Sequence, residues 1–389
     1  MHVRLESLIG YGAAALLATL LATLLATLLA ACGGGGGGVP ESPVAKAPAQ
    51  PLPTSYQNFK AVGLLPQWLP GGAGGNGVIR AYGDFTGRGK LDLFTAALTY
   101  SADRGIAAAT PSRLEIWSRD DNGSWTQAGA LLSTTQGCIH PRRAIVADFN
   151  GDKRPDVFLA CHGFDATPFP GERNLIVLSQ PNGGFLVKAA ANDVGFFHAA
   201  SAADLNADGL PDVVVTNNFD PASVYAFINK GNGVFEREAI ARFPASLRGK
   251  GLFTVELVDV NEDGLPDALV GGHEWDGTTT VALINPGNYQ FAQATAVTLP
   301  AVPGEGVVLD FAVTGSGATR AIWVLRTSGG DGSFYQSRTV QRIQWPSLAS
   351  TTPLRQRPAA WFPWIIPAVI DGVGYVASEE ASVGVRLPQ

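Results

Sequence analysis

The sequence predicts an all-β protein, a β-propeller of four-stranded blades, with six blades or with seven if further strands lie near the chain ends. An aspartate-rich pattern of nine residues occurs three times at nearly equal intervals, starting at Asp148, Asp204 and Asp259. Recurrence of one supersecondary unit along a chain is typical of repeat folds such as propellers. The 389 residues include 47 glycines and only 15% charged residues, which suits short strands and tight turns better than helices.

Short apolar runs flank each of the three patterns and predict the strands of a blade. The run after each pattern is rich in β-branched residues, and a third run follows after a variable stretch. Turns containing Gly and Asn then precede a fourth run, which completes the blade. The runs after the patterns are 156–160, 212–216 and 267–270, and the third runs are 175–178, 224–228 and 281–284.

Three weaker copies of the pattern extend the series to six expected blades. They begin at Asp84, Asp310 and Asp371. The copy at Asp84 keeps the ninth aspartate, Asp92, but has Arg88 at its fifth position. Because the arginine brings its own positive charge, this loop is not expected to bind a metal ion. One blade is expected to combine strands from both ends of the chain, since ring closure protects the sheet edges.

The three strong copies have the composition of calcium-binding loops. Oxygen-bearing side chains stand at positions 1, 3, 5 and 9, and the backbone carbonyl of position 7 can add another oxygen. Calcium takes six to eight oxygen ligands, and each loop supplies several of them. One ion is therefore expected in each loop, about three in all. Gly209 and Gly264, at position 6, permit a tight turn. The expected ligands are Asp148, Asn150, Asp152, Arg154 and Asp156; Asp204, Asn206, Asp208, Leu210 and Asp212; and Asp259, Asn261, Asp263, Leu265 and Asp267.

These loops are not EF-hands. Position 12 of an EF-hand is a bidentate glutamate, whereas here it is Leu159, Val215 or Val270 inside an expected strand. The alternative is a turn rich in Asp and Asn that binds no ion, since these residues favour turns for their own reasons. Three copies in the same phase favour calcium.

The loops and their flanking strands resemble FG-GAP repeats, also described as VCBS repeats, as in the integrin alpha propeller and many exported bacterial proteins. The resemblance covers about residues 56–377 and is strongest over 144–291. It implies a propeller with calcium in loops between the strands of a blade, held by the side chains at positions 1, 3, 5 and 9. The chain departs from the family by lacking a clean Phe-Gly…Gly-Ala-Pro motif and by losing ligands in the weaker copies.

Residues 1–31 are expected to be an export signal. Arg4 supplies a positive charge, and residues 13–31 form an apolar stretch that ends just before Cys32. Residues 29–32 resemble the lipobox of bacterial lipoproteins, in which the cysteine is acylated and becomes the new N-terminus. The alternative is a membrane-spanning anchor, because the stretch approaches spanning length.

Residues 32–54 are expected to form a flexible tether, because a glycine run is followed by a proline-rich segment. The propeller is then expected to occupy residues 55–389. A lipid on Cys32 implies attachment to the bacterial cell envelope, on the periplasmic or surface face. Gly33 replaces the aspartate that is linked with inner-membrane retention in enteric bacteria, which favours the outer membrane.

Two further cysteines, Cys138 and Cys161, lie on either side of the Asp148 loop. Neighbouring strands would bring them face to face, and an exported protein meets an oxidising compartment, so a disulfide is expected. In the chain-entropy model such a bridge stabilises the fold by roughly 3 kcal/mol. Two buried free thiols are the alternative.

Catalytic motifs are absent from the sequence, with no nucleophile elbow, phosphate-binding loop or paired zinc-protease histidines. Several polar residues near the expected innermost strands nevertheless suggest a site in the propeller channel, able to bind an anion or a metal. These are His140, Arg142, His198, His273 and Glu274, with Arg143 beside them. Histidines that only bridge neighbouring blades by hydrogen bonds are the alternative.

Tryptophans near expected loops suggest sugar stacking, at 361–364 and at Trp275, although packing between blades is the alternative. The predicted function is recognition of a protein or polysaccharide by a calcium-stabilised lipoprotein. The lack of catalytic motifs favours this over a polysaccharide lyase or hydrolase with its site in the channel. An envelope assembly role is a further alternative. A net charge of −6 and the lack of any basic block argue against nucleic acid as a partner.

Overall fold

The computed structural model describes residues 78–98, 102–122, 124–359, 364–370, 373–377 and 384–386. The expected export signal, the tether, Cys32, Asp371 and residues 361–363 lie outside these ranges. Within the described ranges, no helix is long and apolar enough to cross a membrane.

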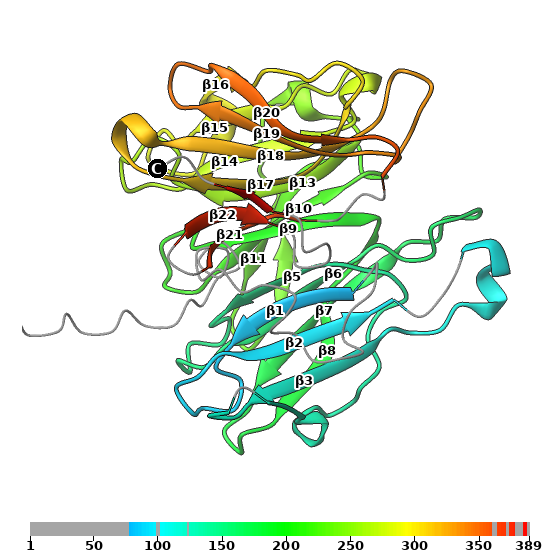
Figure 1. Ribbon diagram of the computed structural model, residues 1–389. Helices are drawn as coiled ribbons and strands as arrows, with labels where there is room; N and C mark the ends of the chain where they lie inside the picture. Colours follow the sequence, from blue (N-terminus) through cyan, green and yellow to red (C-terminus); the bar gives the residue numbers. More distant parts are fainter. Residues whose placement is uncertain are drawn as a thin grey trace, which may run out of the picture. The chain divides into compact units, whose positions relative to one another are not determined.

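Five antiparallel sheets of four strands follow one another along the described chain (Figure 1). Each sheet consists of four consecutive strands in up-and-down order, which confirms a β-propeller with four-stranded blades.

The strands of the five sheets are β1 (Val78–Gly83), β2 (Asp92–Ala97), β3 (Arg113–Arg119) and β4 (Trp125–Gln127); β5 (Pro141–Ala147), β6 (Asp156–Cys161), β7 (Glu172–Ser179) and β8 (Phe185–Gly195); β9 (Phe197–Ala203), β10 (Asp212–Asn217), β11 (Val224–Asn229) and β12 (Phe235–Arg237); β13 (Leu252–Val258), β14 (Asp267–Gly272), β15 (Val281–Ile284) and β16 (Thr295–Thr298); and β17 (Val307–Thr314), β18 (Ala321–Thr327), β19 (Arg338–Gln344) and β20 (Ser350–Gln356). Short 3-10 helices lie in the connections, at η2 (Ala102–Arg104), η3 (Ile106–Ala108), η4 (Gly129–Leu131), η5 (Ala245–Leu247), η6 (Glu274–Asp276), η7 (Phe291–Gln293) and η8 (Gly317–Thr319).

The second strands are apolar throughout because neighbouring sheets cover both of their faces. Every residue of β6, β10 and β14 is buried. A single cluster joins Phe158 of the second sheet to Val213 and Phe227 of the third. A strand buried on both faces loses the alternation of apolar and polar residues, and this explains the continuous β-branched runs after the loops.

The number of four-stranded blades is five, so the expectation of six or seven is wrong for the described residues. Asp310 does not begin a loop, because it lies buried within β17. At Asp371, only two residues separate β21 (Ile366–Ile370) from β22 (Val373–Ala377), too few for a nine-residue loop. Together with β23 (Gly384–Arg386), these strands form a three-stranded sheet, and no described sheet combines strands from both chain ends.

The segment before β21 packs against both the first and the fifth sheets. Trp364 is buried in the cluster of the first two sheets, beneath the guanidinium of Arg80, which confirms a core role for this tryptophan. Ile365 belongs to the cluster of the fifth sheet, and its N–H donates to Asp310 Oδ2 at 2.8 Å. The chain after the fifth blade therefore returns to the first, as closure of a propeller requires.

Loops of different type leave opposite ends of each blade. In an up-and-down sheet, the loop between the first and second strands and the loop between the second and third strands lie at opposite ends. First strands of neighbouring sheets, such as β5 and β9, lie side by side (Figure 1). We call the end with the first-to-second loops the Asp-loop end and the end with the second-to-third loops the pocket end.

Candidate functional site

The aspartate-rich loops of the first four blades share one backbone conformation. Positions 4 and 6 have positive φ in every loop, at Gly87 and Gly89, Gly151 and Lys153, Ala207 and Gly209, and Glu262 and Gly264. Residues other than glycine adopt this region rarely. Its recurrence at the same two positions shows that contacts elsewhere in the loop determine its shape, even where Lys153 replaces a glycine.

The Asp204 loop shows these contacts. Asp204, at position 1, accepts hydrogen bonds from the N–H groups of Asp208 at 3.2 Å and Gly209 at 2.9 Å. Asp212, at position 9, is fully buried and accepts from Leu205 N–H at 2.9 Å and Asn229 N–H at 2.8 Å. The Asp148 and Asp259 loops repeat this arrangement.

The donor chemistry of the three loops fits calcium, since all of their side-chain ligands offer oxygen. The side chains at positions 3 and 5 approach each other, with Asn206 Nδ2 2.9 Å from Asp208 Oδ2. Burial, together with the carboxylates of Asp208 and Asp204, raises the pKa of Asp212 to about 6. The pKa of Asp156 also rises to about 6, again mainly through burial. A divalent cation would relieve this crowding of negative charge.

Within each of these loops, the carboxylate oxygens do not lie close enough together to coordinate one metal ion. Among the described residues, one group of His, Cys, Asp or Glu side chains brings three ligand atoms within 4.8 Å of one another, and it lies at the pocket end. Positions 1 and 9 instead turn toward backbone N–H groups, so calcium would need the exposed side chains of positions 3 and 5 to reorient.

The Asp84 loop contains its own cation, as predicted from the sequence. The Nη2 atom of Arg88 lies 2.9 Å from Asp92 Oδ1, and its Nε donates to Thr86 Oγ1 at 2.7 Å. Asp84 accepts the N–H groups of Arg88 at 2.8 Å and Gly89 at 2.7 Å. The loop therefore keeps the shared conformation while an arginine neutralises the buried aspartate.

A cavity of about 550 Å³ lies at the pocket end. It is lined by side chains of four blades, namely Arg142, His162, Asp165, Phe196, His198, Asn218, Phe219, Phe253, His273, Leu309 and Tyr335. They come from the starts of first strands and from the loops that follow second strands, which all lie at this end. We call this cavity the histidine pocket.

Four imidazoles lie in and beside the histidine pocket. His162 Nε2 lies 3.0 Å from His198 Nε2, and the rings of His140 and His162 are 5.0 Å apart. The Phe253 ring lies between His198 and His273, 4.2 Å from the first and 4.3 Å from the second. The Nε2 atom of His273 is 3.0 Å from the Tyr335 hydroxyl.

Burial keeps these histidines neutral. It lowers the pKa of His140 to about 3 and that of His273 to about 4. It lowers the pKa of His162 and of His198 well below the ordinary value, with the neighbouring His198 adding to the shift of His162. At neutral pH the pocket therefore presents uncharged imidazole nitrogens beside the guanidinium of Arg142, whose Nη1 is 3.4 Å from His140 Nε2.

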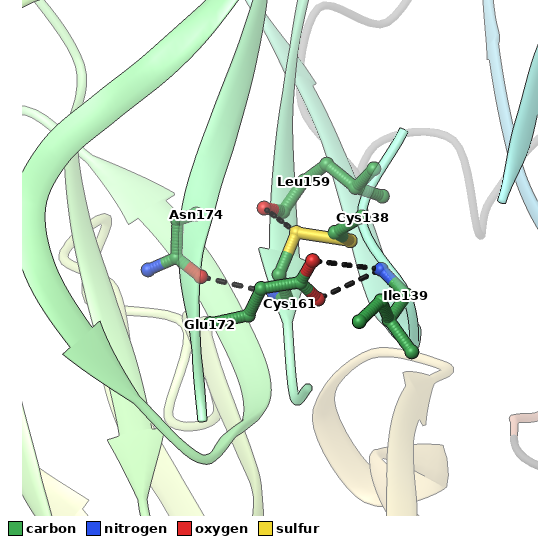
Figure 2. The surroundings of a disulfide bond; sticks show 6 residues. All are labelled: Cys138, Ile139, Leu159, Cys161, Glu172 and Asn174. Atoms are coloured by element: carbon green, nitrogen blue, oxygen red, sulfur yellow. Dashed lines mark hydrogen bonds between the residues drawn. A yellow bond between two sulfur atoms is a disulfide. The ribbon is translucent and has the colours of Figure 1, made fainter. Parts of the chain in front are cut away.

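A disulfide fixes two of the histidines. Cys138 and Cys161 are bonded to each other, with their Cα atoms 6.0 Å apart (Figure 2). Figure 2 also shows both carboxylate oxygens of Glu172 accepting the Ile139 N–H, at 2.9 and 2.8 Å. His140 follows this segment and His162 follows Cys161, and the His162 N–H donates to the His140 carbonyl at 2.8 Å. The bridge thus holds both imidazoles at the wall of the pocket.

Beneath the pocket, a buried polar network links three first strands. Arg143 Nη2 lies 2.9 Å from Asp310 Oδ1 and 3.8 Å from Glu256 Oε1, and all three side chains are almost completely buried. Arg142 and Leu309, the chain neighbours of Arg143 and Asp310, line the pocket itself. We call this network, which lies next to the residues that line the histidine pocket, the floor of the pocket.

Aromatic side chains form an exposed rim around the pocket. Phe169, Phe219, Trp275 and Phe334 are 41%, 62%, 44% and 42% exposed. Each comes from the second-to-third loop of a different blade, in four consecutive blades. Phe219 lies 6.0 Å from Phe169, and Trp275 lies 5.2 Å from Phe334, between ring centroids.

The structure brings together most of the predicted channel site. Arg142, His198 and His273 line the pocket and His140 contacts it, but Glu274 is directed elsewhere. Its carboxylate pairs with Arg326 Nη1 at 2.7 Å and accepts from the Thr280 hydroxyl at 2.5 Å.

His162, Asp165 and the phenylalanines of the rim were missing from the predicted site. His162 directly follows the second strand of its blade, the same place that His273 has in its own blade. That shared position is the signal that identifies His162. Arg143, considered beside the site, belongs to the floor.

A second cavity, of about 640 Å³, is lined by the outer part of the third blade and by the connection that leads to the fourth. Its arginines are paired within the chain, Arg237 with Asp220 and Arg242 with Glu238. The Arg237 guanidinium also covers the Tyr225 ring at 3.8 Å.

Comparisons with known proteins agree with the repeat pattern. A family model described as FG-GAP-like repeat matches residues 84–159 and 204–270, which include all four aspartate-rich loops. Two integrins of Drosophila melanogaster are similar over 84 residues, integrin alpha-PS5 at 39% identity and integrin alpha-PS3 at 38%. Each match covers 20% of this chain but only 8% and 7% of the integrins, so the chain spans less than a tenth of the length of these relatives.

Solved structures with a similar arrangement include an auxiliary nutrient binding protein of Bacteroides thetaiotaomicron. It has a TM-score of 0.44 and 8% identity, over 79% of this chain and 67% of that chain. A rhamnogalacturonan lyase of Bacillus licheniformis has a TM-score of 0.35 and 11% identity, over 79% of this chain and 70% of that chain. On the evidence of its sequence and its sheets, the chain carries FG-GAP-like repeats, and the matched residues contain the four aspartate-rich loops of its β-propeller and strands that flank them.

Proposed function

We propose that this protein is a calcium-stabilised recognition module that binds a polysaccharide at the pocket end of its propeller. The observation that carries the proposal is the rim of four exposed aromatic side chains, one from the same loop of each of four consecutive blades. Exposed aromatic groups that gather at one site mark interaction surfaces, and flat rings stack well on the apolar faces of sugars.

Polar groups inside the rim supply the directional contacts that a sugar needs. Arg142 and Asp165 line the pocket together with the amide of Asn218 and the hydroxyl of Tyr335. A pocket with an apolar rim and a few polar groups is the usual form of a small-ligand site. A sugar unit of a polysaccharide that lies across the rim could insert into the pocket.

The test measures the binding of polysaccharides to the purified protein, with quenching of tryptophan fluorescence as the signal. Phe219→Ala combined with Trp275→Ala should weaken binding at least about tenfold, because two stacking surfaces are lost. Ile240→Ala, at a similarly exposed apolar side chain away from the rim, is the matched control and should bind normally. Equal binding by the double variant and the control would contradict the proposal.

A protein ligand is the competing outcome. Cross-linking in native envelopes, with calcium and again with EDTA, distinguishes the two. Capture of one protein through the rim, without polysaccharide binding, would replace the polysaccharide by a protein partner.

Attachment to the bacterial envelope is part of the same proposal. The support is the match of residues 29–32 to a lipobox, which would place a lipid on Cys32 and the propeller on a tether, at the outer membrane. Cys32→Ala should release the protein from the membrane fraction and remove the mass of the lipid. A variant that stays in the membrane with unchanged mass would contradict lipidation.

Catalysis on a polysaccharide is the second candidate function. It is favoured by the neutral imidazole of His198, which lies in a pocket that also holds Arg142 and Asp165, since such groups can transfer protons. A screen of polysaccharides for cleavage, with His198→Ala as the inactive variant, tests it. Binding without cleavage would leave recognition as the function.

A further inference from the structure

The histidine pocket contains a compact group of metal-ligating atoms. One nitrogen each of His140 and His162 and one carboxylate oxygen of Asp165 lie within 4.8 Å of one another. His198 stands directly beside them, with its Nε2 3.0 Å from His162 Nε2. Two neutral imidazole nitrogens at this separation can share a proton in a hydrogen bond, or both can turn their lone pairs toward one cation.

We infer that His140, His162, His198 and Asp165 form a binding site for a zinc-like transition-metal ion, separate from the calcium loops. Three imidazole nitrogens and one carboxylate oxygen are a ligand set suited to Zn²⁺ or Co²⁺, which accept nitrogen readily and take four ligands. Calcium prefers oxygen and is served by the loops at the opposite end.

The burial of His162 supports a ligand role. Only 1% of its surface is exposed, and its Nε2 faces His198 Nε2 at 3.0 Å. The Nδ1 atom of His198 faces the Phe196 carbonyl at 3.3 Å, so Nε2 is the nitrogen that His198 can offer to an ion. Buried imidazoles held in this way need little reordering to bind a metal ion.

The surrounding chain favours nitrogen ligation over thiolate ligation. The two cysteines nearest to the site are bonded to each other in the disulfide and cannot bind a metal ion. The same bridge, with the hydrogen bond from His162 N–H to the His140 carbonyl, fixes the backbone of two of the ligands. Ligands fixed in advance lose little conformational entropy on binding.

Arg142 acts against a cation at this site. Its Nη1 lies 3.4 Å from His140 Nε2, so its positive charge is close to the proposed ion. The Asp165 carboxylate compensates for this charge in part. Removal of the guanidinium should therefore strengthen metal binding, whereas an anion held by the same pocket would be lost.

The experiment uses the purified protein with calcium in excess, so that the loops are occupied, and titrates it with Co²⁺ and then Zn²⁺. One equivalent of Co²⁺ should give the visible absorption of a four-coordinate site with nitrogen ligands, and Zn²⁺ should displace it. An oxygen-only site such as a loop would give only weak absorption.

Two variants and one control make the site specific. His140→Gln should lower the affinity for Zn²⁺ at least about 100-fold, since even partners of ligands cost about 10–100-fold. Asp165→Asn, which keeps the size of an exposed side chain, should lower it at least about tenfold. His273→Gln, an imidazole of the same pocket outside the group, should keep the affinity within about threefold, and Arg142→Gln should raise it.

Absence of stoichiometric Co²⁺ binding in the wild-type protein would overturn the inference. So would equal binding by His140→Gln and the wild type, or loss of binding in Arg142→Gln. These results are independent of polysaccharide binding, because the metal titration contains no sugar, so a failure of one proposal leaves the other standing.

Discussion

The two ends of the propeller use the same strands to display opposite chemistry. At the Asp-loop end, carboxylates crowd together, and the pKa of Asp156 and of Asp212 is raised to about 6. At the pocket end, three buried imidazoles and the half-buried imidazole of His273 are held neutral, and aromatic rings surround them. Alternation of up and down strands separates the two sets of loops, so residues at one end can vary without changing those at the other.

A second contrast lies within the Asp-loop end itself. The loop at Asp204 has an aspartate at its fifth position, whereas the loop at Asp84 has Arg88, yet both have the same backbone conformation. Backbone N–H groups hold the first aspartate in both loops. The loop shape therefore does not require an ion, and the two loops differ in that the Asp84 loop has a positive charge of its own, on Arg88.

The largest expected effect comes from removal of calcium. Binding to the native state alone stabilises by about 2.7 kcal/mol per site when the ion is at 100 times its Kd, and three loops can contribute. The melting temperature should therefore fall strongly in excess EDTA and recover with added calcium. An unchanged melting temperature in EDTA would show that the three loops are ion-free turns.

Replacement of a ninth aspartate should destabilise loops of both kinds. Asp212→Ala and Asp92→Ala each remove a buried acceptor of two or more hydrogen bonds, and we expect a loss of about 2–4 kcal/mol from urea unfolding in EDTA. Glu236→Ala, at an exposed side chain, is the control. A large loss of stability in Asp212→Ala but not in Asp92→Ala would show that the ninth aspartate does not have the same role in both loops.

Arg88→Asp should convert the arginine loop into a fourth calcium loop. Without calcium, the variant should lose about 1 kcal/mol, because buried Asp92 loses its cation while Arg88 itself is partly exposed. With calcium, the stoichiometry from calorimetry should exceed that of the wild type by one ion. An unchanged stoichiometry would mean that Thr86, at position 3, cannot complete the ligand set.

The two ends should respond to acid with opposite signs. The folded pKa of His273, about 4, lies below its unfolded value of 6.5, so its stabilising effect is complete above pH 6.5 and is lost as pH falls toward 4. The folded pKa of Asp212, about 6, lies above 3.8, so its stabilising effect is lost as pH rises through 6 and returns as pH falls.

Paired variants measure these small effects in EDTA. Between pH 7.5 and 5.5, the stability of the wild type relative to His273→Gln should fall by about 0.5–1 kcal/mol, after discounting for its half-buried position. Relative to Asp212→Asn, it should rise by about 1 kcal/mol. If the relative stability changed in the same direction in both comparisons, the predicted opposite response of the two ends to acid would be wrong.

Repetition explains which parts of the fold the sequence could predict. Three copies in phase identified the strands around Asp148, Asp204 and Asp259, because each copy repeats both the loop and the buried run after it. The prediction of six blades was wrong because it also counted single aspartates, such as Asp310, that do not begin a loop. Asp310 has the sequence neighbours of an anchor, but in β17 it serves as the partner of Arg143 and of the Ile365 N–H.

The histidine pocket was only partly predictable, because its residues come from four blades. Proximity to strand ends identified His140, His198 and His273. Phe169 and Phe219 lie in irregular loops with no periodic signal, and their convergence depends on how neighbouring blades pack. Glu274 was misplaced since its partner, the buried Arg326, lies far away in the sequence.

The ion pairs of Arg143 with Asp310 and Glu256 join the first strands of three blades. If the pocket end binds a polysaccharide as proposed, these buried pairs would keep a long polymer from passing between the three strands. The polymer would then have to lie across the aromatic rim, with a chain end or a side group in the pocket, and its length would not limit binding.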